Sequence, residues 1–222
     1  MNYLDYEKAF SEARLTKYKR ACGGDNQKAL ILYRYNIKLC QKLYGVLNVF
    51  EVVLRNAIDV HYRFVFKDPD WIRSQLKTGG MLEFSPQKDK TLELVSTLVR
   101  QKKYTHDRLV SSVTFGFWTY MFNRIPYRIG GQSLLTIFLA KDHGLNQKTI
   151  FKELTQIKNF RNKIAHHEAI CFDADGNKNI ADVWMHYQLI LKYLRFLGYT
   201  ENQLLAGLDV LPYTTLKKFQ EL

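Results

Sequence analysis

The longest pattern in the sequence is a run of apolar residues that recurs every three or four positions over residues 26–64. Its members are Leu32, Leu39, Leu43, Val46, Phe50, Val53, Ala57 and Val60. Steps of three and four match the period of an α-helix, whereas a half-buried strand alternates every second residue. The pattern predicts one helix of roughly forty residues, and such a helix needs other helices to cover its apolar stripe.

Shorter stretches with helical spacing flank this segment. They predict helices over residues 5–21, 85–103, 105–122, 133–141, 146–164, 180–198 and 201–206. Stretches that contain Gly or Pro separate them, and we expect turns at residues 123–131 and 172–179. No regular strand pattern is present. The sequence therefore predicts an all-α fold, a helical bundle with additional peripheral helices.

The chain is long enough for one domain. It has 222 residues, of which 46% are hydrophobic and 14% aromatic, so it can bury a substantial core. We expect residues 1–25 to form a basic N-terminal helix that is part of the same unit as the bundle of residues 26–222.

The formal net charge is +12. A charge of this size indicates a polyanionic partner, either nucleic acid or an anionic membrane surface, although it can also serve solubility alone. We favour nucleic acid. The N-terminus has no apolar targeting segment, and no apolar stretch is long enough to span a bilayer. These features predict a cytoplasmic protein with no membrane partner.

The cysteines Cys22, Cys40 and Cys171 are odd in number and lack the spacing of a metal site. A disulfide framework is not expected, which fits a reducing cytoplasm. The segment FDADGNKN resembles a calcium loop only superficially, because its glycine comes too early and the bidentate Glu is missing. We therefore expect neither a metal nor another cofactor.

The chemistry concentrates in KNFRNKIAHHE, residues 158–168. Arg161 falls on the apolar stripe of its helix, whose other members are Ile150, Leu154, Ile157 and Ile164. Asn162 and His166 are four residues apart and share a face, whereas Arg161 and His166 are about 140° apart. Both can face one phosphate only if the Arg stem bends, the helix ends there, or a second copy of the helix contributes.

These residue types suit RNA cleavage without metal. Attack by the 2′-hydroxyl needs a base, an acid for the leaving oxygen and a cation near the phosphate. His166 is the candidate acid or base, Arg161 the phosphate ligand, and Asn162 an orienting group. His167 lies on a different face and is equally well explained as structural. The alternative for the whole block is a capped, salt-bridged helix end with an inert His166.

A polar line crosses the long helix at Tyr44, Asn48, Glu51, Arg55 and Asp59. Glu51 and Arg55 have the spacing of an i,i+4 ion pair, so this face is either solvated or packed toward the motif. In the second case Glu51 is the most plausible carboxylate partner of Arg161, because a guanidinium on an apolar stripe is costly to bury alone.

Cations outside the motif are candidates for binding RNA. The last turns of the first predicted helix hold Arg14, Lys17, Lys19 and Arg20, which suit the helix dipole or form a phosphate-facing patch. Arg124 and Arg128 lie in the predicted turn at residues 123–131, and Lys158 is the first residue of the motif. A basic tail holds Lys217 and Lys218.

Three stretches carry a resemblance to a known family. The first is FEVVLRNAID at residues 50–59, and the second is VTFGFWTYMF at residues 113–122. The third is the motif, in which Arg161 and Asn162 are followed by AHHE at residues 165–168. The three stretches occur in the same order as in the family. The chain resembles HEPN domains, and the Abi-like (AbiD/AbiF) abortive-infection proteins in particular. The resemblance implies an all-α HEPN-like bundle, often dimeric, in which the Arg and His serve metal-independent RNA cleavage.

Three functions follow from these features. The first is a HEPN ribonuclease of bacterial anti-phage defence that acts on RNA as a homodimer and is held in check by an antitoxin or a regulatory RNA. Its supporting residues are Glu51, Arg55, His167 and Glu168. The second is a non-catalytic module that holds a structured RNA in a defence or toxin–antitoxin system. The third is an interaction subunit whose basic surface meets an acidic protein.

Overall fold

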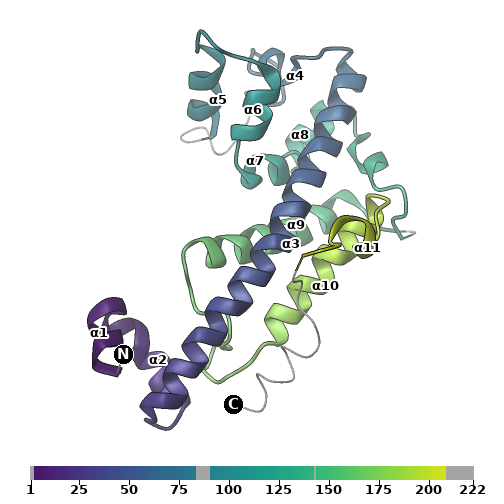
Figure 1. The fold of residues 1–222 in the computed structure, drawn as a ribbon. Helices are drawn as coiled ribbons and strands as arrows, with labels where there is room; N and C mark the ends of the chain where they lie inside the picture. The colour runs from purple at the N-terminus through teal and green to yellow at the C-terminus, as the bar shows by residue number, and fades with distance from the viewer. Residues whose placement is uncertain (1–2, 84–90, 143, 209–222) are drawn as a thin grey trace. The chain divides into compact units, whose positions relative to one another are not determined.

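The structure, a computed structural model, describes residues 3–83, 91–142 and 144–208. Figure 1 shows that these residues are built from helices, which confirms the all-α class. The helices are α1 (Tyr3–Phe10), α2 (Glu12–Ala21), α3 (Asn26–Phe66), α4 (Trp71–Ser74), α5 (Thr91–Val99), α6 (His106–Ser112), α7 (Phe115–Tyr120), α8 (Arg124–Ile129), the 3-10 helix η1 (Leu134–Ile137), α9 (Gln147–Ala165), α10 (Ala181–Phe196) and α11 (Glu201–Leu204). Ser85, Pro86, Lys217 and Lys218 lie outside the described residues.

The chain forms two compact units. The first comprises the chain up to Asn48, Phe160–Ile190 and the segment from Leu205. The second comprises Val49–Asn159 and Leu191–Leu204. The unit boundaries fall within α3, α9 and α10, so each of these helices supplies residues to both cores.

The long helix α3 confirms the prediction from apolar spacing, but its buried face shifts along its length. The predicted core residues from Leu32 to Phe50 are buried, whereas Val60 is 66% exposed. Leu54, Ile58 and Tyr62 are buried instead. A repeat of 3.5 residues drifts by about 20° per heptad on a straight helix, so an apolar pattern of this length moves off the core face.

In the first unit, the predicted helix over residues 5–21 is two helices. The chain breaks at Ser11, which has φ of 71° and whose side chain accepts a hydrogen bond from the Arg14 N–H as the N-cap of α2. Tyr18 of α2 is buried, with its ring 5.2 Å from the rings of both Tyr33 and Phe172. These aromatic contacts join α2, the first half of α3 and the segment after the motif in one core.

The segment after the motif is the hairpin-like turn that the sequence predicts. Phe172 and Lys178 form an isolated antiparallel bridge, and the Asp173 side chain accepts hydrogen bonds from the Asp175 and Asn177 N–H groups. The segment is fixed to α3 by Asn36, whose side-chain oxygen accepts a buried 2.9 Å hydrogen bond from the Ile170 N–H.

In the second unit, the predicted helix over residues 105–122 is also broken. Thr105 caps α6 as expected, because its hydroxyl accepts from the Arg108 N–H. Ser111 and Ser112 then bond back to the Arg108 carbonyl, and Val113 is extended. Serine side chains that compete for backbone groups weaken a helix, and α7 begins only after this break.

Two further predictions in the second unit are wrong. Residues 123–131 were expected to be a turn, but they contain α8, capped by the Asn123 side chain. Pro126 is tolerated because it lies in the first turn, where its missing N–H breaks no helical bond. Residues 133–141 were expected to form a helix, and only Leu134–Ile137 do so, as a single 3-10 turn.

No helix in the described part of the chain combines the length and apolar content that a bilayer span requires.

Candidate functional site

The motif lies at the C-terminal end of α9. The helix begins after Asn146, whose side-chain oxygen accepts a 3.0 Å hydrogen bond from the Thr149 N–H. The stripe predicted from the sequence is buried at Ile150, Leu154, Ile157 and Ile164. This end of α9 is packed further by Phe160, whose ring stacks on the ring of His186 in α10 at a centroid distance of 4.1 Å.

The helix ends within the histidine pair. The His167 N–H donates to the Ile164 carbonyl at 3.0 Å, and the Glu168 N–H donates to the Lys163 carbonyl at 2.9 Å. His167 has φ of 58°, in the left-handed region. These bonds form a Schellman motif, in which His166 is the C-cap and His167 takes the position usually occupied by glycine.

The end of the helix does not turn His166 toward Arg161. The His166 N–H still donates to the Asn162 carbonyl at 2.9 Å, as in a continuing helix. Its side chain therefore leaves the helix about 140° from that of Arg161. Asn162 and His166 are both exposed, whereas Arg161 is half-buried. The helix presents the amide and the imidazole together and the guanidinium on another side.

The side chain of His166 is chemically available. Its imidazole has no hydrogen-bond or ionic partner among the described residues, and neither has the amide of Asn162. A histidine that only supports a fold is commonly held by a hydrogen bond. His186, one helix away, is such a case: it is buried, and its Nδ1 lies 2.7 Å from the Asp182 carbonyl oxygen.

Arg14 of α2 supports this turn, a contact that was not predicted from the sequence. Its Nη1 donates a 2.9 Å hydrogen bond to the carbonyl oxygen of His167. A cation next to the free carbonyls of a helix C-terminus is favourable for the helix dipole. The two residues are 153 positions apart, so no local pattern could indicate the contact.

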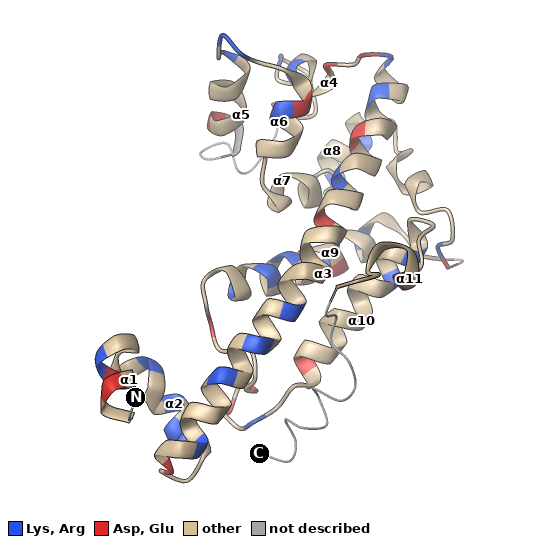
Figure 2. Ribbon diagram, viewed as in Figure 1, with Lys and Arg blue, Asp and Glu red and all other residues tan. Residues whose placement is uncertain are grey.

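The predicted RNA-binding cations of the first unit lie on α2. Lys17 Nζ is 4.7 Å from the centroid of the Phe172 ring, and Lys19 Nζ is 5.1 Å from that of Tyr3. Arg20 is exposed in the last turn of the helix. Figure 2 shows further blue segments on α3, whose first half carries Lys28, Arg34, Lys38 and Lys42 but no Asp or Glu.

The remaining predicted residues belong to the second unit. Arg124 and Arg128 are exposed on α8, and Lys158 is half-buried on α9. Glu51 and Arg55 are half-buried on α3, and the buried Nε of Arg55 has no hydrogen-bond acceptor among the described residues. Glu51 and Arg161 belong to different units, and their pairing stays a prediction.

A partly buried polar cluster in the second unit was not predicted. His106 Nε2 lies 2.7 Å from Asp59 Oδ1, and its Nδ1 lies 3.1 Å from Asp70 Oδ1. Asp59 also accepts a 2.8 Å hydrogen bond from Trp71 Nε1 and forms a 2.8 Å ion pair with Arg63. Both ring nitrogens of His106 face carboxylates, so the ring joins α3, α4 and α6 and is not a free base.

The charges in this cluster favour a protonated imidazole. Burial alone would lower the pKa of His106, but its hydrogen bonds to Asp59 and Asp70 and the charge of Asp59 outweigh burial and raise that pKa. Burial alone would raise the pKa of Asp59, but its hydrogen bonds from His106 and Trp71 and the charge of Arg63 lower it. The cluster thus combines two carboxylates, Asp59 and Asp70, with two groups that can carry positive charge, His106 and Arg63.

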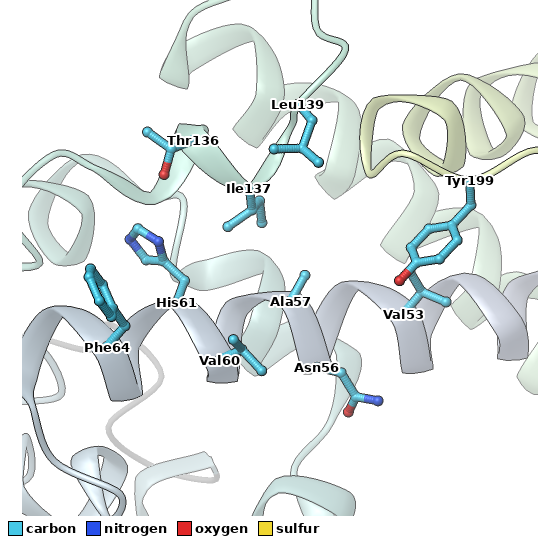
Figure 3. A pocket seen from close by; sticks show the side chains of 10 residues that line it. All are labelled: Val53, Asn56, Ala57, Val60, His61, Phe64, Thr136, Ile137, Leu139 and Tyr199. Atoms are coloured by element: carbon cyan, nitrogen blue, oxygen red, sulfur yellow. The ribbon is translucent and has the colours of Figure 1, made fainter.

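A groove of about 570 Å³ crosses the second unit, between α3 and the segment around η1 (Figure 3). Phe64 and Leu139 on its rim are 82% and 80% exposed. Beside the groove, the Nε2 atom of His61 lies 3.0 Å from the Oγ atom of Ser133. No Lys or Arg is among the described residues that line the groove, so it offers a phosphate no counter-charge.

Comparisons of the chain with protein-family models, curated proteins and solved structures gave no match.

Proposed function

We propose that the chain is a metal-independent endoribonuclease of the Abi-like HEPN type that acts in bacterial anti-phage defence. The observation that carries the proposal is the exposed, unpartnered imidazole of His166, one helical turn from the exposed amide of Asn162. Proton transfer needs a group that reaches the substrate and titrates near neutral pH, and histidine is the side chain that does so without special surroundings.

The reaction is an internal transfer on RNA. The 2′-oxygen forms a bond to phosphorus while the bond from phosphorus to the 5′-oxygen breaks. A base takes the proton of the 2′-hydroxyl, and an acid gives a proton to the leaving 5′-oxygen. His166 fills one of these roles, Arg161 stabilises the charge on the phosphate, and Asn162 orients the phosphate or the imidazole.

Two copies of the chain supply the second proton-transfer group. One α9 offers a single His166, and that side chain leaves the helix about 140° from Arg161. A two-fold dimer that brings the two α9 ends together provides two imidazoles and two guanidinium groups at one site. The proposed active form is therefore a homodimer.

The second candidate is an RNA-binding module without catalysis. The basic residues of α2 and the acid-free first half of α3 favour it, because dispersed Lys and Arg bind a phosphate backbone whatever the motif does. Both candidates bind RNA with an affinity that falls steeply with salt, so affinity alone does not separate them.

The chemistry of the cleaved ends separates the two candidates. Purified protein is incubated with cellular RNA in excess EDTA, and the product ends are identified. We expect cleavage to survive chelation and to leave 2′,3′-cyclic phosphate or 3′-phosphate ends, because the phosphate stays with the attacking hydroxyl. Loss of cleavage in EDTA, or 5′-phosphate ends, would indicate a metal-activated water and contradict the proposal. RNA that is bound but left whole favours the binding module.

A further inference from the structure

A pocket of about 560 Å³ opens beside the motif within the first unit. It lies between the end of α1, the start of α2, α3 and the turn that follows α9. Phe10, Arg14, Tyr33, Gln41 and His167 are among the residues that line it. Its volume is in the range of sites that hold small ligands, roughly 300–1,000 Å³.

One wall of the pocket is aromatic. Phe10 is 39% exposed, and its ring centroid lies 5.2 Å from that of the buried Tyr33 and 5.8 Å from that of Tyr6. The ring is therefore held in place by other rings while part of it faces the pocket. An exposed, immobilised aromatic face is the feature on which unpaired bases stack in RNA-binding proteins.

The lining also includes the polar side chains of Arg14, Asn36, Gln41 and His167, and no Asp or Glu is among its described residues. Arg14 uses one N–H for the His167 carbonyl, and a guanidinium has five. The Gln41 side chain is exposed and has no partner among the described residues, so its amide can both donate and accept. These groups suit a neutral, flat ligand that has hydrogen-bond donors and acceptors along its edge. Such a ligand can be attached to a phosphate, as a nucleobase is.

The position of the pocket relates it to the reaction. His167 lines the pocket and follows His166 directly in the chain, so the Cα atoms of the two residues are about 3.8 Å apart. A nucleotide whose base enters the pocket therefore lies next to the turn that holds His166. Arg14, which fixes this turn through the His167 carbonyl, also lines the pocket.

We propose that this pocket is a nucleobase subsite, which holds one unpaired base of single-stranded RNA beside the bond to be cleaved. The proposal rests on the ribonuclease function and adds a substrate class, single-stranded RNA selected by the base next to the cleaved bond. Phe10 stacks on the base, and Gln41 and Arg14 bind its edge.

Binding is measured on short oligoribonucleotides whose 2′-O-methyl groups prevent cleavage. In a series of these oligonucleotides, an abasic nucleotide replaces one position at a time. We expect one abasic position to weaken binding to the wild type about tenfold, the equivalent of one stacked base. Phe10→Leu and Gln41→Ala should reduce that difference to about twofold or less, because they remove the aromatic face and the amide. The controls Phe64→Leu and Gln27→Ala, at exposed positions outside the pocket, should keep the full difference.

Cleavage of unmodified RNA is the second readout. We expect a preference of about tenfold or more for one base next to the cleaved bond, and Phe10→Leu and Gln41→Ala should flatten it. Cleavage without base preference, together with equal binding of all abasic oligonucleotides, would overturn the subsite and leave the ribonuclease standing. Abasic sensitivity that depends on Phe10, without any cleavage, would overturn the ribonuclease and keep the base-binding pocket. If the protein binds no RNA and a protein partner closes the pocket, both the base subsite and the ribonuclease are wrong.

Discussion

His167 holds a conformation that few side chains tolerate. Its φ of 58° lies in the left-handed region, which costs L-residues roughly 1–2 kcal/mol and which Asn and Gly adopt more readily. The Schellman bonds of Ile164 and Lys163 and the hydrogen bond from Arg14 hold it there. The turn that carries His166 is thus fixed by backbone bonds and one distant guanidinium.

This geometry predicts the effect of substitutions at His167. His167→Val should lower the free energy of unfolding by roughly 1–2 kcal/mol, because a β-branched residue disfavours positive φ. His167→Asn should be close to neutral. Urea denaturation of both variants checks the difference. Equal stability of the Val and Asn variants would contradict the left-handed conformation of residue 167.

His106 predicts a dependence of stability on pH. Its pKa is raised in the folded protein, so the stabilisation is complete below the unfolded pKa of about 6.5 and is lost as the pH rises through the folded pKa. His106→Gln should cost about 1.5–3 kcal/mol at pH 6, since it removes a hydrogen bond between charged groups. The difference from wild type should shrink as the pH rises.

Thermal unfolding of wild type and His106→Gln between pH 5.5 and pH 9, roughly the range where carboxylates stay ionised, measures this effect. A difference between the two proteins that is constant with pH, or that grows as the pH rises, would show that the imidazole is not charged in the fold.

At the scale of elements, the helices with long, regular apolar spacing could be predicted from the sequence. α3 and α9 are examples, because many buried positions repeat the same period. The breaks could not be predicted, because they depend on single residues. Ser11 ends α1 by adopting positive φ, and Val113 is extended after two serines bond back to the chain. α8 was missed because Pro126 and the following glycines suggest a turn.

The site was predictable only where its residues are close in sequence. Arg161, Asn162 and His166 form a compact motif, and the place of each on α9 agrees with the helical period. The contacts of Arg14 and His106 were missed because their partners are distant in the chain: Arg14 is 153 residues from His167, and His106 is 47 residues from Asp59. Contacts of this kind depend on the packing of helices and leave no local pattern.

The shift of the buried face along α3 predicts a contrast between two substitutions. Leu54→Ala should cost about 2–5 kcal/mol, because Leu54 is fully buried and its removal leaves a cavity. Val60→Ala, at a position that the repeat alone assigns to the core, should cost about 0.5 kcal/mol or less, as at most exposed sites. Denaturant midpoints of the two variants test this, and a larger loss from Val60→Ala would contradict the shift.

At the scale of the whole molecule, the proposal requires two copies of the chain. If both His166 side chains act at one shared site, mixed dimers of wild type and His166→Ala are inactive. An equal mixture with random pairing should then keep about one quarter of the activity, whereas independent sites should keep about one half. Subunits are exchanged before the assay, and sedimentation confirms the dimer. A fully active monomer at micromolar concentration would remove the shared site.

The net charge of +12 is also a property of the whole chain, and under either proposed function we expect it to supply most of the affinity for RNA. Because Lys and Arg are spread over both units, no single cation should dominate binding. Affinity and catalysis can therefore be changed separately, since the residues proposed for proton transfer contribute no positive charge when neutral.

The cleavage rate and the RNA affinity of His166→Ala, measured on the same RNA in EDTA, test the central claim most directly. Asn159→Ala, an exposed position on the same helix, is the control for surface substitution on α9. We predict that His166→Ala cleaves about a hundredfold more slowly or worse, with RNA affinity within about twofold of wild type, and that Asn159→Ala behaves like wild type. Equal cleavage by wild type and His166→Ala would contradict the assignment of His166 as the proton-transfer group.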